Sequence, residues 1–243
     1  MTSPPPSRER SAVRVAVIDS GVHAGHPHIK SVAGGAFVAP EGNIEEGSFS
    51  DRLGHGTAVM AAIQEKAGEA EYFAIKVFDN SLRTTARTLF SAIEWAIARK
   101  MDIVNMSLGT CNPAHAERFR ELVRQAVDAG ISVVAARETG RQACFPGCIP
   151  GVLAVGLDER CDRNAYRVQE TAEGIVFLAS GYPRPAPGIP KERNLQGISF
   201  AVANITGFAA RALRDLDSRD PMSLRSTLIQ GAAHAPPRAI DRE

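Results

Sequence analysis

Short apolar stretches and amphipathic stretches alternate along most of this chain. Residues 13–18 read Val-Arg-Val-Ala-Val-Ile, a β-branched and almost wholly apolar pattern typical of a buried strand in a parallel sheet. Similar stretches predict further strands at 31–38, 72–78, 102–108, 131–136, 150–156 and 174–179. Apolar residues at helical spacing predict helices at 58–63, 84–100, 113–129, 199–213 and about 221–230. This alternation predicts one α/β domain, a doubly wound and mostly parallel sheet flanked by helices.

The domain boundaries follow from where this alternation begins and ends. We expect a disordered arm at 1–12, the folded domain at 13–231 and a tail at 232–243. The first ten residues hold no apolar core of the kind a secretory signal needs, and we see no run of about 18 apolar residues to span a membrane. The net charge of +1 gives no reason to expect nucleic acid or an anionic membrane as a partner. The simplest location is cytoplasmic.

Two groups of residues raise the question of a metal. Cys144 and Cys148 lie four apart in a loop rich in Pro and Gly, and Cys111 and Cys161 are the only other thiols. A zinc site usually has closer-spaced pairs, so free thiols of a reducing compartment are the favoured interpretation. The segment 23–28 has the pattern H-x-x-H-x-H, but it lies in a loop with no fixed face. We therefore predict no metal and no cofactor.

Three residues carry the candidate chemistry. Asp19 ends the first strand, where open α/β sheets place their sites, although Asp-Ser-Gly is also ordinary turn chemistry. His55 stands between two glycines at the start of a helix, and Asp51 before it is placed to cap or orient that loop. Ser199 follows Gly197-Ile198 at the start of another helix, where a plain N-cap serine is the alternative. A serine nucleophile needs a base, and the base needs an orienting carboxylate.

These segments resemble the motifs of the subtilisin-like serine peptidases. Residues 15–22 resemble the aspartate motif, 51–57 the histidine motif and 197–201 the serine motif, in the family's order Asp, His, Ser. The resemblance runs from about 13 to 231. It implies that Ser199 attacks a peptide carbonyl, that His55 is the general base and then the acid, and that Asp19 orients His55. It also implies a protein or peptide substrate and a subtilisin-like fold.

The same resemblance assigns a substrate-binding wall. Residues 103–109 resemble the family's strand that pairs with the substrate backbone, so Ser107, Leu108 and Gly109 are expected to contact substrate. Ala135 and Ala136, at the end of the strand at 131–136, are expected to line the same site. Phe145-Pro146 resembles an aromatic–proline step that is often cis in this family.

The chain departs from the family at the oxyanion hole. The family usually places an asparagine after a strand such as 133–136, whereas this chain continues Arg137-Glu138-Thr139-Gly140. Alignment without a gap places Thr139 there, and a shift of one residue places Glu138 there. A threonine hydroxyl donates but reaches less far, and an ionised glutamate repels an oxyanion. Loss of that donor costs about 10²–10³ in kcat, a figure that comes from subtilisin itself.

Three functions remain open on the sequence. We favour a dedicated processing endopeptidase that removes a leader from a precursor peptide, because the glutamates at 65–71 make no calcium loop like that of secreted relatives and we see no pro-segment. In size and layout the chain resembles compact subtilisin-like proteases of modified-peptide biosynthesis, including the type that serves maturation of a quinohemoprotein amine dehydrogenase. The alternatives are a pseudoprotease that only binds peptides, and an esterase or amidase with the same triad.

Overall fold

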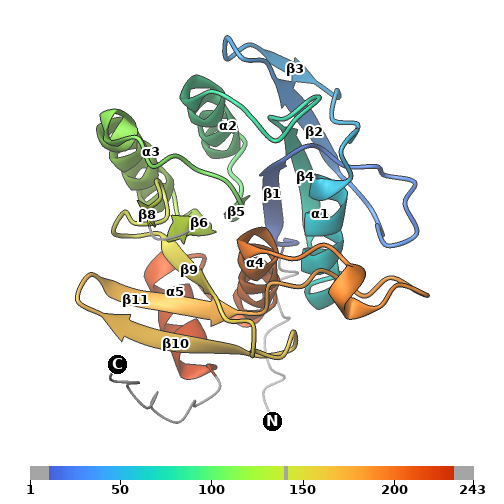
Figure 1. Ribbon diagram of the computed structural model, residues 1–243. Coiled ribbons are helices and arrows are strands. Elements are labelled where there is room, and N and C mark those ends of the chain that lie inside the picture. Colours follow the sequence, from blue (N-terminus) through green and yellow to red (C-terminus); the bar gives the residue numbers. More distant parts are fainter. Residues whose placement is uncertain (1–10, 140–141, 233–243) are drawn as a thin grey trace, which may run out of the picture.

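The computed structural model describes residues 11–139 and 142–232 (Figure 1). Most of the expected N-terminal arm and of the C-terminal tail lies outside the described residues. The strands are β1 Arg14–Asp19, β2 Gly34–Val38, β3 Ile44–Glu46, β4 Glu71–Lys76, β5 Ile103–Met106, β6 Ser132–Ala136, β7 Glu138–Thr139, β8 Gln142–Ala143, β9 Leu153–Leu157, β10 Tyr166–Thr171 and β11 Gly174–Ala179. The α-helices are α1 His55–Lys66, α2 Ala86–Ala98, α3 Ala116–Asp128, α4 Ile198–Asp215 and α5 Pro221–Gln230.

Nine strands form one sheet in the order β10-β11-β9-β6-β5-β1-β4-β2-β3. The seven strands from β11 to β2 pair in parallel, and only β10 and β3 at the edges are antiparallel. The strand order reverses at β1, because β4 and β2 are added on one side of β1 and β5, β6 and β9 on the other. In open α/β sheets, sites form where the carboxyl ends of such strands meet, so Asp19 lies at the expected place.

The helices cover both faces of the sheet (Figure 1). One core packs α1, α4 and α5 against the sheet, with Phe200 and Phe208 of α4 among its buried aromatic residues. The other packs α2 and α3 on the opposite face, around Trp95 and Phe119. The predicted doubly wound, mostly parallel α/β architecture is confirmed. Both candidate helices, α1 with His55 and α4 with Ser199, lie on the same face and pack against each other.

The structure also contains strands that the sequence pattern did not predict. β10 is an edge strand with alternating polar residues, and β3 is exposed throughout. The segment 137–149, predicted to be a loop, contains the short hairpin of β7 and β8. These strands lack a continuous apolar run because they lie at edges, where one or both faces meet water.

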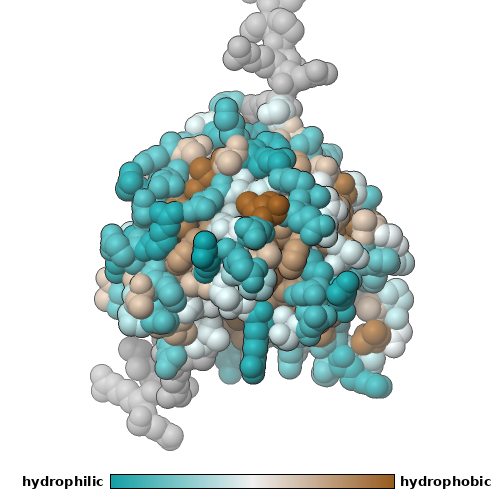
Figure 2. Space-filling model, turned by 90° about the horizontal axis from the view of Figure 1, so that it is seen from above, coloured by the Kyte–Doolittle hydropathy of each residue, from teal (hydrophilic) through white to brown (hydrophobic). Residues whose placement is uncertain are grey.

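The face of the molecule that is seen from above is largely polar (Figure 2). Viewed from above, apolar side chains occur only in small separate groups among polar ones (Figure 2). None of the helices in the described parts of the chain is both long enough and apolar enough to cross a membrane.

Candidate active site

Asp19 is the last residue of β1 and is almost wholly buried, with 1% of its side chain exposed. Its Oδ1 accepts a hydrogen bond from the backbone N–H of Ser20 at 2.7 Å and lies 2.7 Å from Nδ1 of His55. Within the described structure Asp19 Oδ2 has no hydrogen-bond partner. A buried carboxylate with one oxygen on an imidazole nitrogen fixes both the ring orientation and the tautomer that donates to it.

His55 is the first residue of α1, and its side chain is 19% exposed. Gly56 beside it must be glycine, because a Cβ there would lie 2.3 Å from the carbonyl oxygen of Gly21. The backbone of the β1 turn therefore lies directly against the start of α1. Burial disfavours the imidazolium, but the hydrogen bond and charge of Asp19, helped by Asp51, outweigh it and hold the pKa of His55 above its ordinary value. Asp19 therefore makes His55 a stronger base.

Asp51 holds the loop that leads into His55, as its position before the helix predicted. Ser20 is the link that sequence reasoning treated only as a turn residue: its buried hydroxyl donates to Asp51 at 2.9 Å and accepts from the N–H of Gly56 at 2.8 Å. These bonds join the end of β1 to the first turn of α1. Burial alone would raise the pKa of Asp51, but the hydrogen bonds donated to its carboxylate outweigh burial and hold that pKa below its ordinary value. Five hydrogen bonds reach its carboxylate, from Ser20 Oγ, Leu53 N, Gly54 N, Thr57 N and Thr57 Oγ1.

Ser199 lies in the first turn of α4. Gly197 before it has φ 145°, a conformation that side chains rarely adopt, and this turn delivers the serine to the helix start. The Ser199 hydroxyl donates to the carbonyl of Ser107 at 3.4 Å, and the Ser107 hydroxyl donates to the carbonyl of Ser199 at 3.2 Å. The ring of His55 packs 5.7 Å from that of Phe200, centroid to centroid. The start of α4, the start of α1 and the segment after β5 therefore meet at one place.

Buried amides fix α4 behind the serine. Asn105 of β5 donates to Thr206 of α4 at 2.9 Å and accepts from Ser107 at 3.3 Å. Asn204 is fully buried and donates to the carbonyl of Ser180 at 2.8 Å, which holds the segment before the serine loop. Asn204 is thus an anchor between α4 and the residue that follows β11.

Of the expected substrate-binding residues, Ser107 contacts Ser199 directly. Ser107 is buried, whereas Leu108 is partly exposed and Gly109 exposed, so the segment after β5 turns from the core to the surface. Ala135 pairs in register with Met106, which places Ala135 and Ala136 on the neighbouring strand. The structure thus brings the two predicted walls side by side. The Phe145–Pro146 bond is cis, as the resemblance implied.

Thr139 lies in the exposed hairpin of β7 and β8, at its turn end. Its side chain lowers the pKa of the Cys144 thiol, against the larger effect of burial. The side chain of Glu138, the other candidate at this position, is exposed in the same strand. The hairpin follows directly after β6, so the segment that should supply the second oxyanion donor is a short, exposed ribbon rather than a packed element.

All four cysteines are free thiols, as favoured from the sequence. Burial raises the pKa of the Cys144 thiol to about 11, and burial also raises the pKa of Cys148. Across the described ranges, no three His, Cys, Asp or Glu side chains are grouped as metal ligands would be. The histidines at 23, 26 and 28 line a cavity, which is described below.

Several solved structures share this fold. Sphericase superposes with a TM-score of 0.73 at 22% identity, over 90% of this chain and 83% of its own. The prenylagaramide maturation protease PagA superposes with a TM-score of 0.69 at 23% identity, over 95% of this chain and 86% of its own. At these identities the likeness establishes the fold, which is that of subtilisin-like proteases.

Sequence relatives carry the assignment further. Subtilisin E of Bacillus subtilis (strain 168) is 31% identical over 214 residues, which are 82% of this chain and 52% of the relative. The thermostable alkaline protease of Halalkalibacterium halodurans is 31% identical over 243 residues, 92% of this chain and 63% of the relative. The chain therefore spans about half the length of subtilisin E. The family model "Subtilase family" matches residues 10–243. This chain belongs to the subtilase family.

Proposed function

We propose that this protein is a serine endopeptidase whose triad is Asp19, His55 and Ser199. The observation that carries the proposal is the contact of 2.7 Å between Asp19 and His55, with the helix of Ser199 packed beside the imidazole. Residues far apart in the chain thereby form a base with an orienting carboxylate next to a partly exposed helix start. A serine that served only as an N-cap would need neither the base His55 nor the carboxylate of Asp19 beside it.

The proposed reaction follows the acyl-transfer scheme. His55 accepts the proton as Ser199 Oγ attacks the scissile carbonyl, and the same proton then passes to the leaving amine. Asp19 stabilises the imidazolium that forms between these steps. The backbone N–H of Ser199 and the hydroxyl of Thr139 are the proposed oxyanion donors. Substrate backbone pairs with Ser107, Leu108 and Gly109 as an added strand, opposite Ala135 and Ala136.

The substrate is proposed to be a precursor peptide. Two structural neighbours support this: one is named a maturation protease for prenylagaramide, and another is named a lanthipeptide protease, with a TM-score of 0.66 at 17% identity. The weak oxyanion site fits a slow and selective enzyme. The free thiols fit a reducing, cytoplasmic location.

One observation favours a second candidate, a module that binds peptides without cleaving them. The Ser199 hydroxyl is turned to the carbonyl of Ser107 at 3.4 Å in this structure, and the family's oxyanion asparagine is replaced. The Asp19–His55 contact of a working base is nevertheless in place, so we place the enzyme first. An esterase or amidase would act on small acyl esters and leave peptides intact.

The test is a comparison of new protein N-termini. Purified wild type and Ser199→Ala are each incubated with a denatured bacterial cell extract, and new N-termini are identified by mass spectrometry. We expect a small set of cleavages with one shared sequence pattern in the wild type and none in the variant. A folded wild type that generates no new N-termini would contradict the proposal and favour the binding module.

A further inference from the structure

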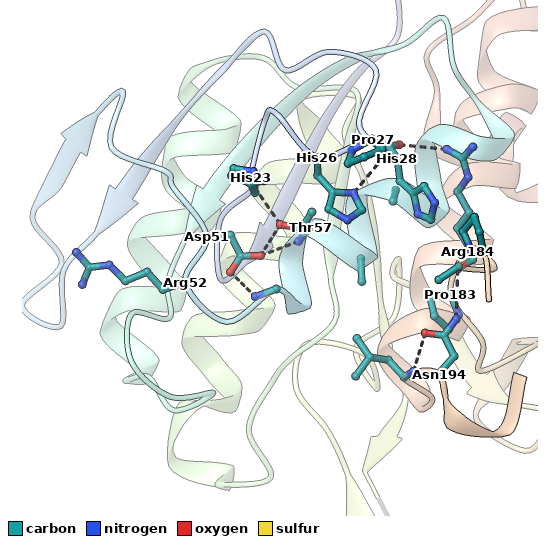
Figure 3. Close-up of a pocket in the computed structure, with 16 residues that line it drawn as sticks. His23, His26, Pro27, His28, Asp51, Arg52, Thr57, Pro183, Arg184 and Asn194 are labelled. Carbon is teal, nitrogen blue, oxygen red and sulfur yellow. Dashed lines mark hydrogen bonds between the residues drawn. The ribbon is translucent and has the colours of Figure 1, made fainter. Parts of the chain in front are cut away.

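A cavity of about 630 Å³ opens beside the candidate active site (Figure 3). Its walls are the loop 23–28, the first turns of α1 and the segment 183–195 that leads to Ser199. Its volume falls in the range of about 300–1,000 Å³ that ligand sites occupy. We propose that this cavity binds an acidic side chain of the substrate, on the C-terminal side of the cleaved bond. The proposal rests on the proposed peptidase function.

The position of the cavity determines which side of the cleaved peptide bond it can bind. Its edge includes Gly54 and Thr57, which flank His55 in the chain, and Leu195, four residues before Ser199. The leaving amine must lie next to His55, because that residue gives it a proton. The backbone that continues from the amine therefore passes over the start of α1 toward the cavity, while the acyl side lies along 107–109.

The charged groups at the cavity are mainly cationic or cationic on protonation. Arg184 enters from one wall, and His23, His26 and His28 enter from another (Figure 3). The guanidinium of Arg184 donates to the carbonyl of His28 at 3.2 Å, which joins the two walls. After burial, the charges of Arg184 and His26 are the main reasons that the pKa of His28 lies below its ordinary value. Such a field favours an anion.

The carboxylates near the cavity are already engaged. Asp51, the one acid among the lining residues, is held by the five hydrogen bonds of the α1 loop. Glu65 lies close enough to influence His28, but its carboxylate pairs with Arg163. Arg52, at the rim, pairs with Asp79 at 3.3 Å. Asp51 is therefore the one carboxylate in the cavity lining, and it belongs to the loop before α1 rather than to the segment of Arg184. The charge of Arg184 also lowers the pKa of Glu65, but Glu65 lies outside the lining.

The remaining lining offers a glutamate or aspartate a hydrogen-bond donor and apolar contacts. The Nδ1 atom of His26 accepts the backbone N–H of His28 at 3.1 Å, so the proton of the neutral ring is on Nε2 and that nitrogen is a donor. Asn194 holds the opposite wall, since it donates to the carbonyl of Arg184 at 3.4 Å. Apolar side chains, including Pro27 and Leu195, supply contacts for the methylene groups of an acidic side chain.

A randomised decapeptide library tests the substrate class. The library is incubated with the full wild-type chain, and the products are sequenced by mass spectrometry. We expect Glu and Asp to be enriched over Gln and Asn at one of the first three positions after the cleaved bond. Equal frequencies of acids and amides at all three positions would overturn the proposal.

Two variants test whether Arg184 recognises the acidic side chain. Two peptides of the best-cleaved sequence, differing only by Glu or Gln at the enriched position, are compared in kcat/KM. We expect a preference for Glu of about tenfold in the wild type, lost in Arg184→Gln. Arg193→Gln is the matched control, since Arg193 lies exposed in the same loop and outside the cavity wall. A preference that survives in Arg184→Gln would refute the assignment.

A binding measurement separates this proposal from the peptidase. Fluorescein-labelled alanine-based decapeptides, each with one Glu or one Gln, are titrated by anisotropy into Ser199→Ala. We expect at least one Glu peptide to bind about tenfold more tightly than its Gln partner, and the difference to vanish in Ser199→Ala/Arg184→Gln. This outcome with no cleavage by the wild type would remove the peptidase and keep the acidic site. Equal binding of all pairs would remove the site.

Discussion

The two sides of the candidate site differ in how they are held. On one side, Asp19 and His55 lie at a strand end and a helix start, and Ser20 and Asp51 join these elements through hydrogen bonds of 2.6 to 2.9 Å. On the other side, Thr139 lies in a two-residue strand whose side chains face solvent. The proposed acid–base side is held by buried elements and hydrogen bonds, and the proposed oxyanion side by a hairpin.

This contrast indicates where the chain is free to vary. Geometry that sets proton transfer is built from buried elements that many residues support. The proposed oxyanion donor, Thr139, stands on a segment with few supports, so this residue can change without loss of the fold. We therefore expect changes at Asp19 to act through the pKa of His55, and changes at Thr139 to act on rate alone.

The largest effect is expected from Asp19→Asn. This change removes the charge that raises the pKa of His55 and lets the imidazole adopt the wrong tautomer, with a loss of about 10⁴ in kcat. In the wild type the pKa of His55 is raised above the ordinary histidine value of about 6.5. Protonated His55 cannot act as a base, so the acidic limb of the kcat/KM profile against pH should lie above pH 6.5. In the variant this limb moves to lower pH. Asp128→Asn, exposed on α3, should leave both rate and limb unchanged.

A smaller effect is expected from Thr139→Val, which keeps the shape and removes the hydroxyl. If the hydroxyl donates to the oxyanion, kcat falls more than about tenfold while KM changes little. Thr139→Asn restores a longer donor and should raise kcat above the wild type. A kcat that is the same in all three proteins would remove Thr139 from the mechanism, and another group would then have to donate to the oxyanion.

Asp51→Ala tests the support of the rigid side through stability. Five hydrogen bonds are lost from a half-buried carboxylate, and the free energy of unfolding at pH 7 should fall by about 2 kcal/mol after allowance for solvent screening. The pKa of Asp51 is lower in the folded protein, so its contribution is present above about pH 4 and declines as pH falls through the folded value. Urea unfolding at pH 7 and pH 3 should show a difference that shrinks in acid.

The smallest effect concerns the thiols beside the hairpin. With a pKa of about 11, Cys144 is thiolate in only about one molecule in 10³ at pH 8, and it is buried, whereas Cys111 is exposed. Iodoacetamide labelling followed by peptide mapping should modify Cys111 far faster than Cys144. Equal rates would show that the hairpin opens readily.

The fold was predictable where the core dictates it. β1 and β6 carry apolar runs that only a buried parallel strand explains, and Trp95 and Phe119 fall on helical spacing. β10 was not predictable, because it is an edge strand whose polar residues face water and interrupt the apolar pattern. The hairpin of β7 and β8 was missed for the same reason: its side chains bury nothing that periodicity could reveal.

The site was predictable to the extent that its motifs are local. Asp19, His55 and Ser199 each stand in a short motif, and their meeting follows from strand ends at one edge of the sheet. The Ser20–Asp51 bond joins residues 31 positions apart, and the Arg184–His28 bond joins residues 156 apart. Neither leaves a pattern in one segment. The cavity was missed because its two walls come together only in the folded chain.

The central claim is that His55 and Asp19 activate Ser199, and a fluorophosphonate probe tests it most directly. Such a probe forms a covalent adduct with a serine only where that serine is activated. The account predicts an adduct on Ser199 in the wild type, identified by peptide mass spectrometry, none in Ser199→Ala and very slow labelling in His55→Ala. A folded wild type that takes up no probe, or takes it up at another residue, would contradict it.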